Sequence, residues 1–192
     1  GTLQRPTIGG GANWGGSAFD PETSLLYVRS TESISANQVC RNLGDDPDVD
    51  VDYSNNCPHG AAAMIFRSRP GATEVARSKL GPIPLTKPPY AYLVAIDLNA
   101  GEIAWKVPFG EGSRVMRSHP LLQGVELPER LGTPGNPGPL VTRGGLVLLG
   151  GGGPYLYAFD KVTGEEIWRG VTPNRTSANP MTYVALSGRQ FV

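Results

Sequence analysis

The sequence has no excess charge of either sign. Its 17 Lys and Arg residues balance 17 Asp and Glu residues, so the formal net charge is zero at pH 7. Proteins that bind nucleic acid or an anionic membrane surface usually carry a basic excess, so we expect neither kind of partner. Long apolar runs are also absent. The longest, residues 61–66, is far short of the roughly 20 residues that a membrane-spanning helix needs.

The two ends of the sequence lack the marks of a complete chain. Residues 1–6 have no initiator Met, no basic segment and no apolar segment, so they do not form a signal peptide. Residues 188–192 suggest a turn followed by a strand that has only begun. We therefore expect an internal or C-terminal part of a longer protein.

Cysteine and histidine are scarce. Cys40 and Cys57 are separated by 16 residues in a polar segment, and the pair forms either a disulfide in an oxidising compartment or two free thiols. No Cys-x-x-Cys spacing occurs, which argues against a zinc site. His59 and His119 are the only histidines, and neither has Ser and Asp partners at the spacing of a hydrolase triad.

Glycine and proline are abundant, with 26 and 18 residues. Such a supply of helix-breaking residues leaves little room for long helices, while a hydrophobic content of 39% argues against disorder. Short strands joined by turns are the natural interpretation. We expect strands at 25–28, 92–96, 103–107, 140–142, 146–149, 155–159, 181–185 and 190–192.

An internal repeat is the strongest signal. Residues 95–105 and 158–168, which begin 63 positions apart, both fit the pattern A-x-D-x-x-x-G-E-x-x-W, and residues 18–28 form a weaker copy. In the two full copies Asp can begin a turn, Gly can close it with a positive φ, and Trp offers a flat face for packing, whereas the weaker copy has Ser24 in place of Gly and Tyr27 one position short of the Trp. A single hairpin cannot bury that Trp, so repeats must stack, and Gly-rich four-stranded units favour a propeller over a solenoid.

A long insertion, about residues 30–90, separates the first two copies. It holds both cysteines and an acidic stretch, residues 45–52, in which Asp48, Asp50 and Asp52 alternate. The spacing fails the EF-hand pattern, because positions six and twelve are Tyr53 and His59. A looser calcium site and a solvated acidic loop both remain open.

Glycine clusters occur at residues 9–11, 15–16 and 150–153. No Gly-Lys pair follows them, which argues against a phosphate-binding loop, so we expect close backbone packing or a turn that faces a cofactor. Asn13 and Trp14 stand between two of these clusters. Together they can bind a flat ligand, with the indole as a wall and the amide on a carbonyl, or they form an ordinary turn.

The repeats and their flanks resemble the quinoprotein alcohol/glucose dehydrogenase family, and most closely its membrane-type glucose dehydrogenases. These proteins are eight-bladed propellers that bind pyrroloquinoline quinone (PQQ). The resemblance implies an all-β fold comprising about three blades of such a propeller, over residues 1–192, with the three motif copies in separate blades. The stretches that carry it are residues 11–23, 95–105, 138–147, 158–168, 179–183 and 188–192.

The resemblance also implies a set of cofactor residues. Asn13 corresponds to an Asn that contacts PQQ, Trp14 accompanies it, and Tyr155 stands where alcohol-oxidising relatives carry a Trp near the quinone. In the family, the catalytic Asp, the calcium ligands and the aromatic lid over PQQ come largely from earlier blades, and none of them can be matched here. No catalytic or metal-binding residue is therefore assigned to this chain.

The implied parent enzyme uses PQQ and Ca²⁺ to oxidise an alcohol or an aldose sugar, and passes electrons to a quinone or a cytochrome. It faces the periplasm, with or without an inner-membrane anchor, which suits a Cys40–Cys57 disulfide. Alone, this chain is expected to be inactive and to self-associate. The alternatives are a non-catalytic propeller scaffold that binds proteins, and an isolated lectin-like or interaction domain.

Overall fold

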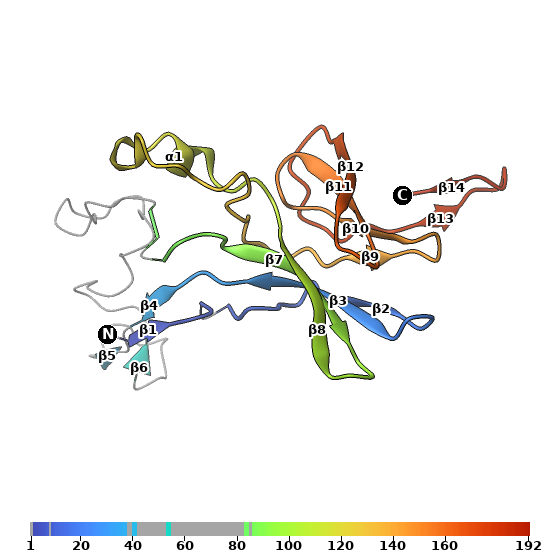
Figure 1. The fold of residues 1–192 in the computed structure, drawn as a ribbon, viewed down its shortest axis with the longest axis horizontal. Coiled ribbons are helices and arrows are strands. Elements are labelled where there is room, and N and C mark those ends of the chain that lie inside the picture. The colour runs from blue at the N-terminus through green and yellow to red at the C-terminus, as the bar shows by residue number, and fades with distance from the viewer. Residues whose placement is uncertain (1, 8, 38–39, 42–52, 55–82, 85) are drawn as a thin grey trace, which may run out of the picture.

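The computed structural model describes residues 2–7, 9–37, 40–41, 53–54, 83–84 and 86–192 (Figure 1). This part of the chain is almost entirely β-structure, as the sequence predicts. Its helices are one short α-helix, α1 (Arg114–Arg117), and one 3₁₀ turn, η2 (Pro120–Leu122). No helix in the described ranges has the length and apolar character needed to cross a membrane.

Two four-stranded antiparallel sheets form the body of the molecule (Figure 1). The first has the order β2 (Ser17–Asp20), β3 (Leu25–Thr31), β7 (Ala91–Asp97), β8 (Glu102–Pro108). The second has the order β9 (Leu140–Val141), β10 (Leu146–Leu149), β11 (Tyr155–Asp160), β12 (Glu166–Val171). A further hairpin, β13 (Tyr183–Val184) with β14 (Gln190–Phe191), follows the second sheet.

The main hydrophobic core lies between the two sheets. Strands β2 and β9, the first of each sheet, contact one another, so the sheets are adjacent with their first strands on the same side. The residues of this core occupy every second position of the inner strands, because successive side chains of a strand point to opposite faces of its sheet. The buried cluster comprises Tyr27, Leu93, Ala95, Phe109, Val147, Leu149, Tyr157 and Phe159.

The motif copies at 18–28 and 95–105 belong to one sheet, and the prediction that they occupy separate blades was wrong. The first copy forms β2 and β3, the second forms β7 and β8, and β3 pairs with β7 from Leu25↔Asp97 to Thr31↔Ala91. The insertion thus connects the end of β3 to the start of β7, its neighbour in the same sheet. The described residues form two four-stranded units and the β13–β14 hairpin that follows them.

The turns of the repeats are built as their sequence predicts. Asp97 Oδ1 accepts hydrogen bonds from the backbone N–H groups of the next turn residues, at 2.8 and 3.1 Å, and Asp160 Oδ1 does the same at 2.8 Å. Gly101 and Gly164 close these turns with φ of 72° and 74°. In the weak copy Ser24 holds the corresponding place, with φ of 58°, although it is not glycine.

Trp105 joins the two sheets, as the repeat predicts. Its half-buried indole donates from Nε1 to the carbonyl of Lys161 at 3.2 Å and lies against the backbone of Gly164. A Cβ added at Gly164 would lie 2.6 Å from the Trp105 ring, so only glycine fits there. Trp168, the equivalent residue of the second sheet, is 54% exposed.

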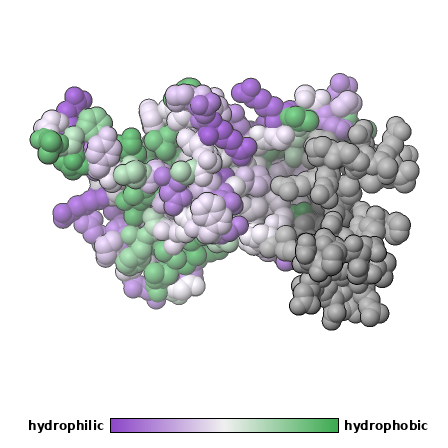
Figure 2. All heavy atoms as spheres, turned by 180° about the vertical axis from the view of Figure 1, so that it is seen from behind, coloured by the Kyte–Doolittle hydropathy of each residue, from purple (hydrophilic) through white to green (hydrophobic). Residues whose placement is uncertain are grey.

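All eight predicted segments contain or overlap an observed strand, and β8 and β12 carry the two motif tryptophans. Strands β2 and β12, and the short strands β1, β4, β5 and β6, were not among the predicted segments. Figure 2, viewed from behind, shows hydrophobic and hydrophilic residues mixed over the surface, with hydrophobic residues at the far left where the β13–β14 hairpin projects.

The insertion between β3 and β7 is described only in part. Its described pieces include β4 (Ser35–Asn37), which pairs with β1 (Thr2–Gln4), and β5 (Cys40–Arg41), which pairs with β6 (Tyr53–Ser54). Cys57, His59 and the alternating Asp48, Asp50 and Asp52 lie outside the described residues. The disulfide and the calcium loop therefore stay predictions.

Candidate functional site

The Asn13–Trp14 pair lies in a tight turn that leads into β2. Asn13 Nδ2 donates to the carbonyl of Gly9 at 2.8 Å, and Asn13 Oδ1 accepts from the backbone N–H of Trp14 at 2.7 Å. The Asn13 carbonyl accepts from the N–H of Gly16 at 3.0 Å, which closes the turn. These bonds fix the amide and occupy one of its two N–H groups, while the second has no partner within the turn.

Trp14 is the most exposed of the three tryptophans, at 79%. An indole of this size is normally buried or half-buried in a folded protein. Here the ring stands in solvent beside an exposed amide, among residues 9–16 that carry little side-chain bulk. Such an arrangement can offer a flat face and a hydrogen-bond donor to a planar ligand.

Glycines allow the loop before β2 and the loop before β9 to come into direct contact. A Cβ added at Gly15 would lie 1.6 Å from the carbonyl oxygen of Asn136, and one added at Gly138 would lie 2.1 Å from that of Gly15. Both glycines are buried. The glycine framing predicted from the sequence is therefore a close backbone approach, and it places the Asn13 turn beside the entry to β9.

Asn179 joins both of these loops. Its Nδ2 donates to the carbonyl of Gly15 and its Oδ1 accepts from the N–H of Gly138, each at 2.7 Å. Asn179 lies in the segment that leads into β13. In the sequence it stands out only as part of a stretch that resembles the family, and its separation of 164 residues from Gly15 leaves no local signal of the contact.

Arg29 is a second residue that sequence reasoning missed. It is 4% exposed, and it donates to the carbonyls of Thr133 at 2.7 Å and of Gly150 and Gly151 at 3.2 Å each. Its guanidinium lies 4.8 Å from the centre of the Phe109 ring. Because Leu25, Tyr27 and Arg29 share one face of β3, the period of two could have predicted its burial.

No carboxylate pairs with Arg29 among the described residues, and its Nε has no hydrogen-bond partner there. Burial, and secondarily the charge of Arg175, lowers its pKa to about 10. Arg29 is therefore a buried cation at neutral pH. Its field favours an anionic group near the 133–138 and 150–153 loops.

Tyr155 stands at the start of β11 and is half-buried. Its ring centre lies 5.9 Å from that of Tyr157, and the Arg169 guanidinium lies 5.7 Å from it. In the described part of the chain, Tyr155 has no ring contact or hydrogen bond with the Asn13 turn. Its role at a cofactor stays a prediction.

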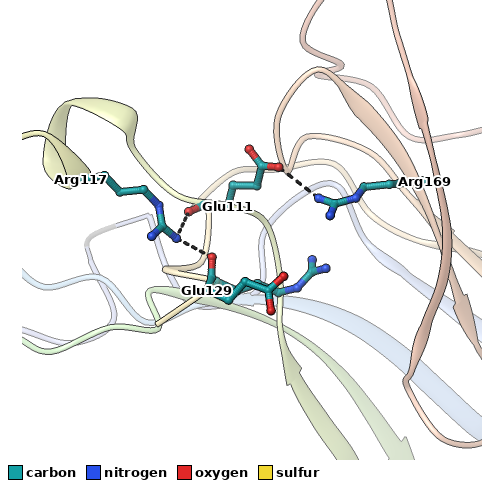
Figure 3. A pocket seen from close by; sticks show the side chains of 5 residues that line it. Glu111, Arg117, Glu129 and Arg169 are labelled. Carbon is teal, nitrogen blue, oxygen red and sulfur yellow. Dashed lines mark hydrogen bonds and ion pairs between the residues drawn. The ribbon is translucent and has the colours of Figure 1, made fainter. Parts of the chain in front are cut away.

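A charged pocket of about 130 Å³ lies beside Arg169 (Figure 3). Arg169 Nη1 pairs with the Glu111 carboxylate at 3.1 Å, and Arg117 donates to the backbone carbonyls of Glu111, Pro128 and Glu129. Arg130, the remaining lining residue, pairs with Glu166 at 2.5 Å. The three arginines that line the pocket are thus bonded to carboxylates and backbone carbonyls. These bonds hold the 109–131 loop against β12.

The remaining candidates for chemistry are structural or undescribed. His119 caps η2, with its Nδ1 accepting from the N–H of Leu121 at 3.3 Å. Among the described residues no group of three or more His, Cys, Asp or Glu is placed to hold a metal ion. Tyr157, whose pKa burial raises to about 12 with help from Glu111 and Glu166, is closed in the core.

Comparison with known proteins gives one consistent family. The family model of the PQQ glucose/ethanol/alcohol dehydrogenase β-propeller domain matches residues 1–192. The chain is 35% identical over its full length to a probable quinate dehydrogenase (quinone) of Xanthomonas campestris pv. juglandis, and 30% identical to the quinate/shikimate dehydrogenase (quinone) of Acinetobacter baylyi. It covers 24% of each of these relatives, so it spans about a quarter of their length.

Solved structures agree on the fold. A quinohemoprotein alcohol dehydrogenase from Comamonas testosteroni matches 98% of this chain with a TM-score of 0.59 and 21% identity, over 23% of its own length. A europium-containing methanol dehydrogenase matches 99% of this chain with a TM-score of 0.54 and 18% identity, over 26% of its own length. The two sheets and the following hairpin are thus a segment of a β-propeller.

Proposed function

Because the chain belongs to the quinoprotein dehydrogenase propeller family, we propose that it supplies one side of the PQQ site of a dehydrogenase that oxidises an alcohol or an aldose sugar. The observation that carries this proposal is the exposed Asn13–Trp14 turn, framed by the buried Gly15 and Gly138 where neighbouring blades meet. The relatives' names, and the match over the whole chain, support it.

The residues of the turn fit a planar, anionic quinone. PQQ, when bound, accepts the electrons that leave the substrate. Asn13 offers its second amide N–H to a quinone carbonyl, and Trp14 offers an exposed aromatic face. The buried charge of Arg29 lies under the adjoining loops and favours the carboxylates that PQQ carries.

The chain's own residues bind and orient, and the proton-accepting group is expected in other blades. We infer that a metal ion, Ca²⁺ in this proposal, completes the site from residues outside this chain. Because one protein of similar fold is a europium-containing methanol dehydrogenase, a lanthanide is the alternative to test. Electron acceptors are proposed to be a quinone or a cytochrome, both of which appear in relatives' names.

The substrate class is proposed from the relatives' names and from the chemistry of PQQ. Relatives are named for quinate, glycerol and glucose, which share several hydroxyl groups. We therefore propose a polyhydroxylated alcohol or aldose, with these three compounds as the first to assay.

Periplasmic location, with or without an inner-membrane anchor, is part of the same proposal. Self-association of the isolated chain finds no support in the structure or the relatives.

The test uses the complete polypeptide that contains residues 1–192, purified without PQQ. Titration with PQQ in the presence of Ca²⁺ or a lanthanide, followed by tryptophan fluorescence, is expected to show saturable binding. Asn13→Ala is expected to weaken binding about fivefold to tenfold, as the loss of one hydrogen bond to a cofactor predicts. Asn174→Ala, an exposed residue of another loop, is the control.

Absence of PQQ binding by the wild-type protein would overturn the proposal and favour the scaffold alternative. Saturable binding that Asn13→Ala leaves unchanged would keep the family assignment but remove the Asn13 turn from the site. Dye-linked oxidation of quinate, glycerol and glucose then identifies the substrate class.

A further inference from the structure

We propose that Asn179 is the positioning residue that fixes the Asn13 turn in its cofactor-facing geometry. This inference rests on the proposed function of that turn. The two side-chain hydrogen bonds of Asn179 are both 2.7 Å long and join the carbonyl of Gly15 to the N–H of Gly138. One amide thereby connects the loops that enter β2, β9 and β13, the first strands of three successive units.

The contacts around Gly15 transmit its position to Asn13. Gly15 follows Trp14 directly, and the next residue, Gly16, donates its N–H to the Asn13 carbonyl at 3.0 Å. On its other side Gly15 is packed against Asn136 and Gly138 without room for even a Cβ. A change in where the Gly15 carbonyl points must therefore move the turn that holds Asn13.

The blades are held together elsewhere by different groups. The bonds of Trp105 and Tyr27 to the Lys161 carbonyl, at 3.2 and 2.9 Å, lie at the opposite ends of the strands from Gly15 and Gly138. The ion pair between Asp20 and Lys161, at 2.8 Å, lies there too. Asn179 is itself an exposed residue, so its loss should disturb the local loops more than the packing of the two sheets.

Asn179→Asp is the most informative change. An aspartate keeps an oxygen that accepts from the Gly138 N–H, but it loses the donor to Gly15 and sets a carboxylate against that carbonyl. Asn179→Ala removes both bonds. Asn174→Asp makes the same chemical change at an exposed position in the same connection between β12 and β13, and serves as the matched control.

The experiment uses the complete polypeptide and has two readouts. In the protein without PQQ, hydrogen exchange is expected to speed up in the 9–16 and 136–138 segments of Asn179→Asp and Asn179→Ala, while the thermal midpoint changes little. PQQ titration is expected to show about fivefold weaker binding in both variants, because the displaced Asn13 amide loses its one hydrogen bond to the cofactor. In a double-mutant cycle, the effects of Asn13→Ala and Asn179→Asp on the free energy of PQQ binding are expected to be less than additive.

Three results separate the possible failures. Unchanged exchange in the 9–16 segment would overturn the positioning role, whatever the cofactor does. Faster exchange with PQQ affinity equal to the wild type, or with fully additive effects of the two substitutions, would overturn the link to the cofactor site. If the wild type binds no PQQ but exchange still rises, the proposed function fails while the structural connection through Asn179 stands.

Discussion

The indole of Trp105 and the carbonyl of Lys161, 56 residues apart in the chain, form a hydrogen bond between the two sheets. Its Nε1 donates at 3.2 Å, and the same carbonyl accepts from the Tyr27 hydroxyl at 2.9 Å. The Tyr27 and Trp105 rings lie 5.8 Å apart. One backbone oxygen of the second unit thus receives two aromatic donors from the first.

Trp105→Phe is expected to destabilise the protein by about 1 kcal/mol, because it removes the donor to Lys161 while keeping an aromatic ring. Urea unfolding of the protein without PQQ measures the change. Trp14→Phe, at the 79% exposed position, should leave the midpoint unchanged. Equal effects of the two substitutions would show that the hydrogen bond does not stabilise the sheet contact.

Ser24→Gly is expected to stabilise the protein by roughly 0.5–1 kcal/mol. Ser24 has φ of 58°, a left-handed conformation. Glycine adopts it without strain, whereas a residue with a Cβ is strained there. Ser30→Gly, within the regular strand β3, should instead destabilise by a similar amount. Thermal unfolding of both variants provides the comparison, and a lower midpoint for Ser24→Gly would contradict the turn assignment.

Arg29→Met is expected to destabilise by about 1–3 kcal/mol, since it leaves the carbonyls of Thr133, Gly150 and Gly151 buried without their donor. Arg29→Lys keeps the charge but cannot reach three carbonyls, so we expect an intermediate loss. Arg143→Met, a 91% exposed arginine, is the control for chemical unfolding. If PQQ affinity falls more in Arg29→Met than in Arg29→Lys, the buried charge contributes to binding.

The ion pair between Asp20 and Lys161 predicts an acid-dependent contribution to stability. The hydrogen bond from Lys161 lowers the pKa of Asp20, and the same bond raises the pKa of Lys161. A depressed carboxyl pKa stabilises the fold above the unfolded value of about 3.9 and loses that effect as the pH falls through the folded pKa. A raised lysine pKa stabilises below about 10.4 and loses its effect as the pH rises further.

Asp20→Asn should therefore lower the urea midpoint by a constant amount between about pH 5 and 9, and the difference from wild type should shrink below about pH 4. Glu22→Gln, whose carboxylate is half-exposed and 3.7 Å from Lys161, is expected to have a smaller effect. A difference between wild type and Asp20→Asn that persists undiminished in acid would show that the ion pair is not the source of the stability.

The local chemistry of the repeats could be predicted from the sequence because it depends on neighbours in the chain. The Asp97 and Asp160 turns need only an acceptor, a glycine and the few residues between them. Trp105 needed a partner 56 residues away, yet the repeat implied it. The strands could be predicted for the same reason, since a short apolar run bounded by turn residues is a local property of the sequence.

The pairing of β3 with β7 could not be predicted in this way. An insertion of almost 60 residues lies between them, and nothing in the local pattern says whether the chain resumes the same sheet or begins another. The contacts of Asn179 and Arg29 are equally long-range. They join side chains to backbone N–H and C=O groups, which leave no signature in the sequence because almost every residue carries them. The glycines of the sequence indicated the Asn13 turn itself. They did not indicate that the loops of Gly138 and Asn179 hold it in place.

The proposed function depends above all on whether the Asn13–Trp14 turn faces PQQ. A structure of the complete polypeptide loaded with PQQ, by crystallography or electron cryo-microscopy, answers this question. We expect quinone density within hydrogen-bond distance of Asn13 Nδ2, beside the loops that Asn179 joins. Quinone density bound elsewhere, with the Asn13 amide turned to solvent or covered by protein, would refute the proposed site.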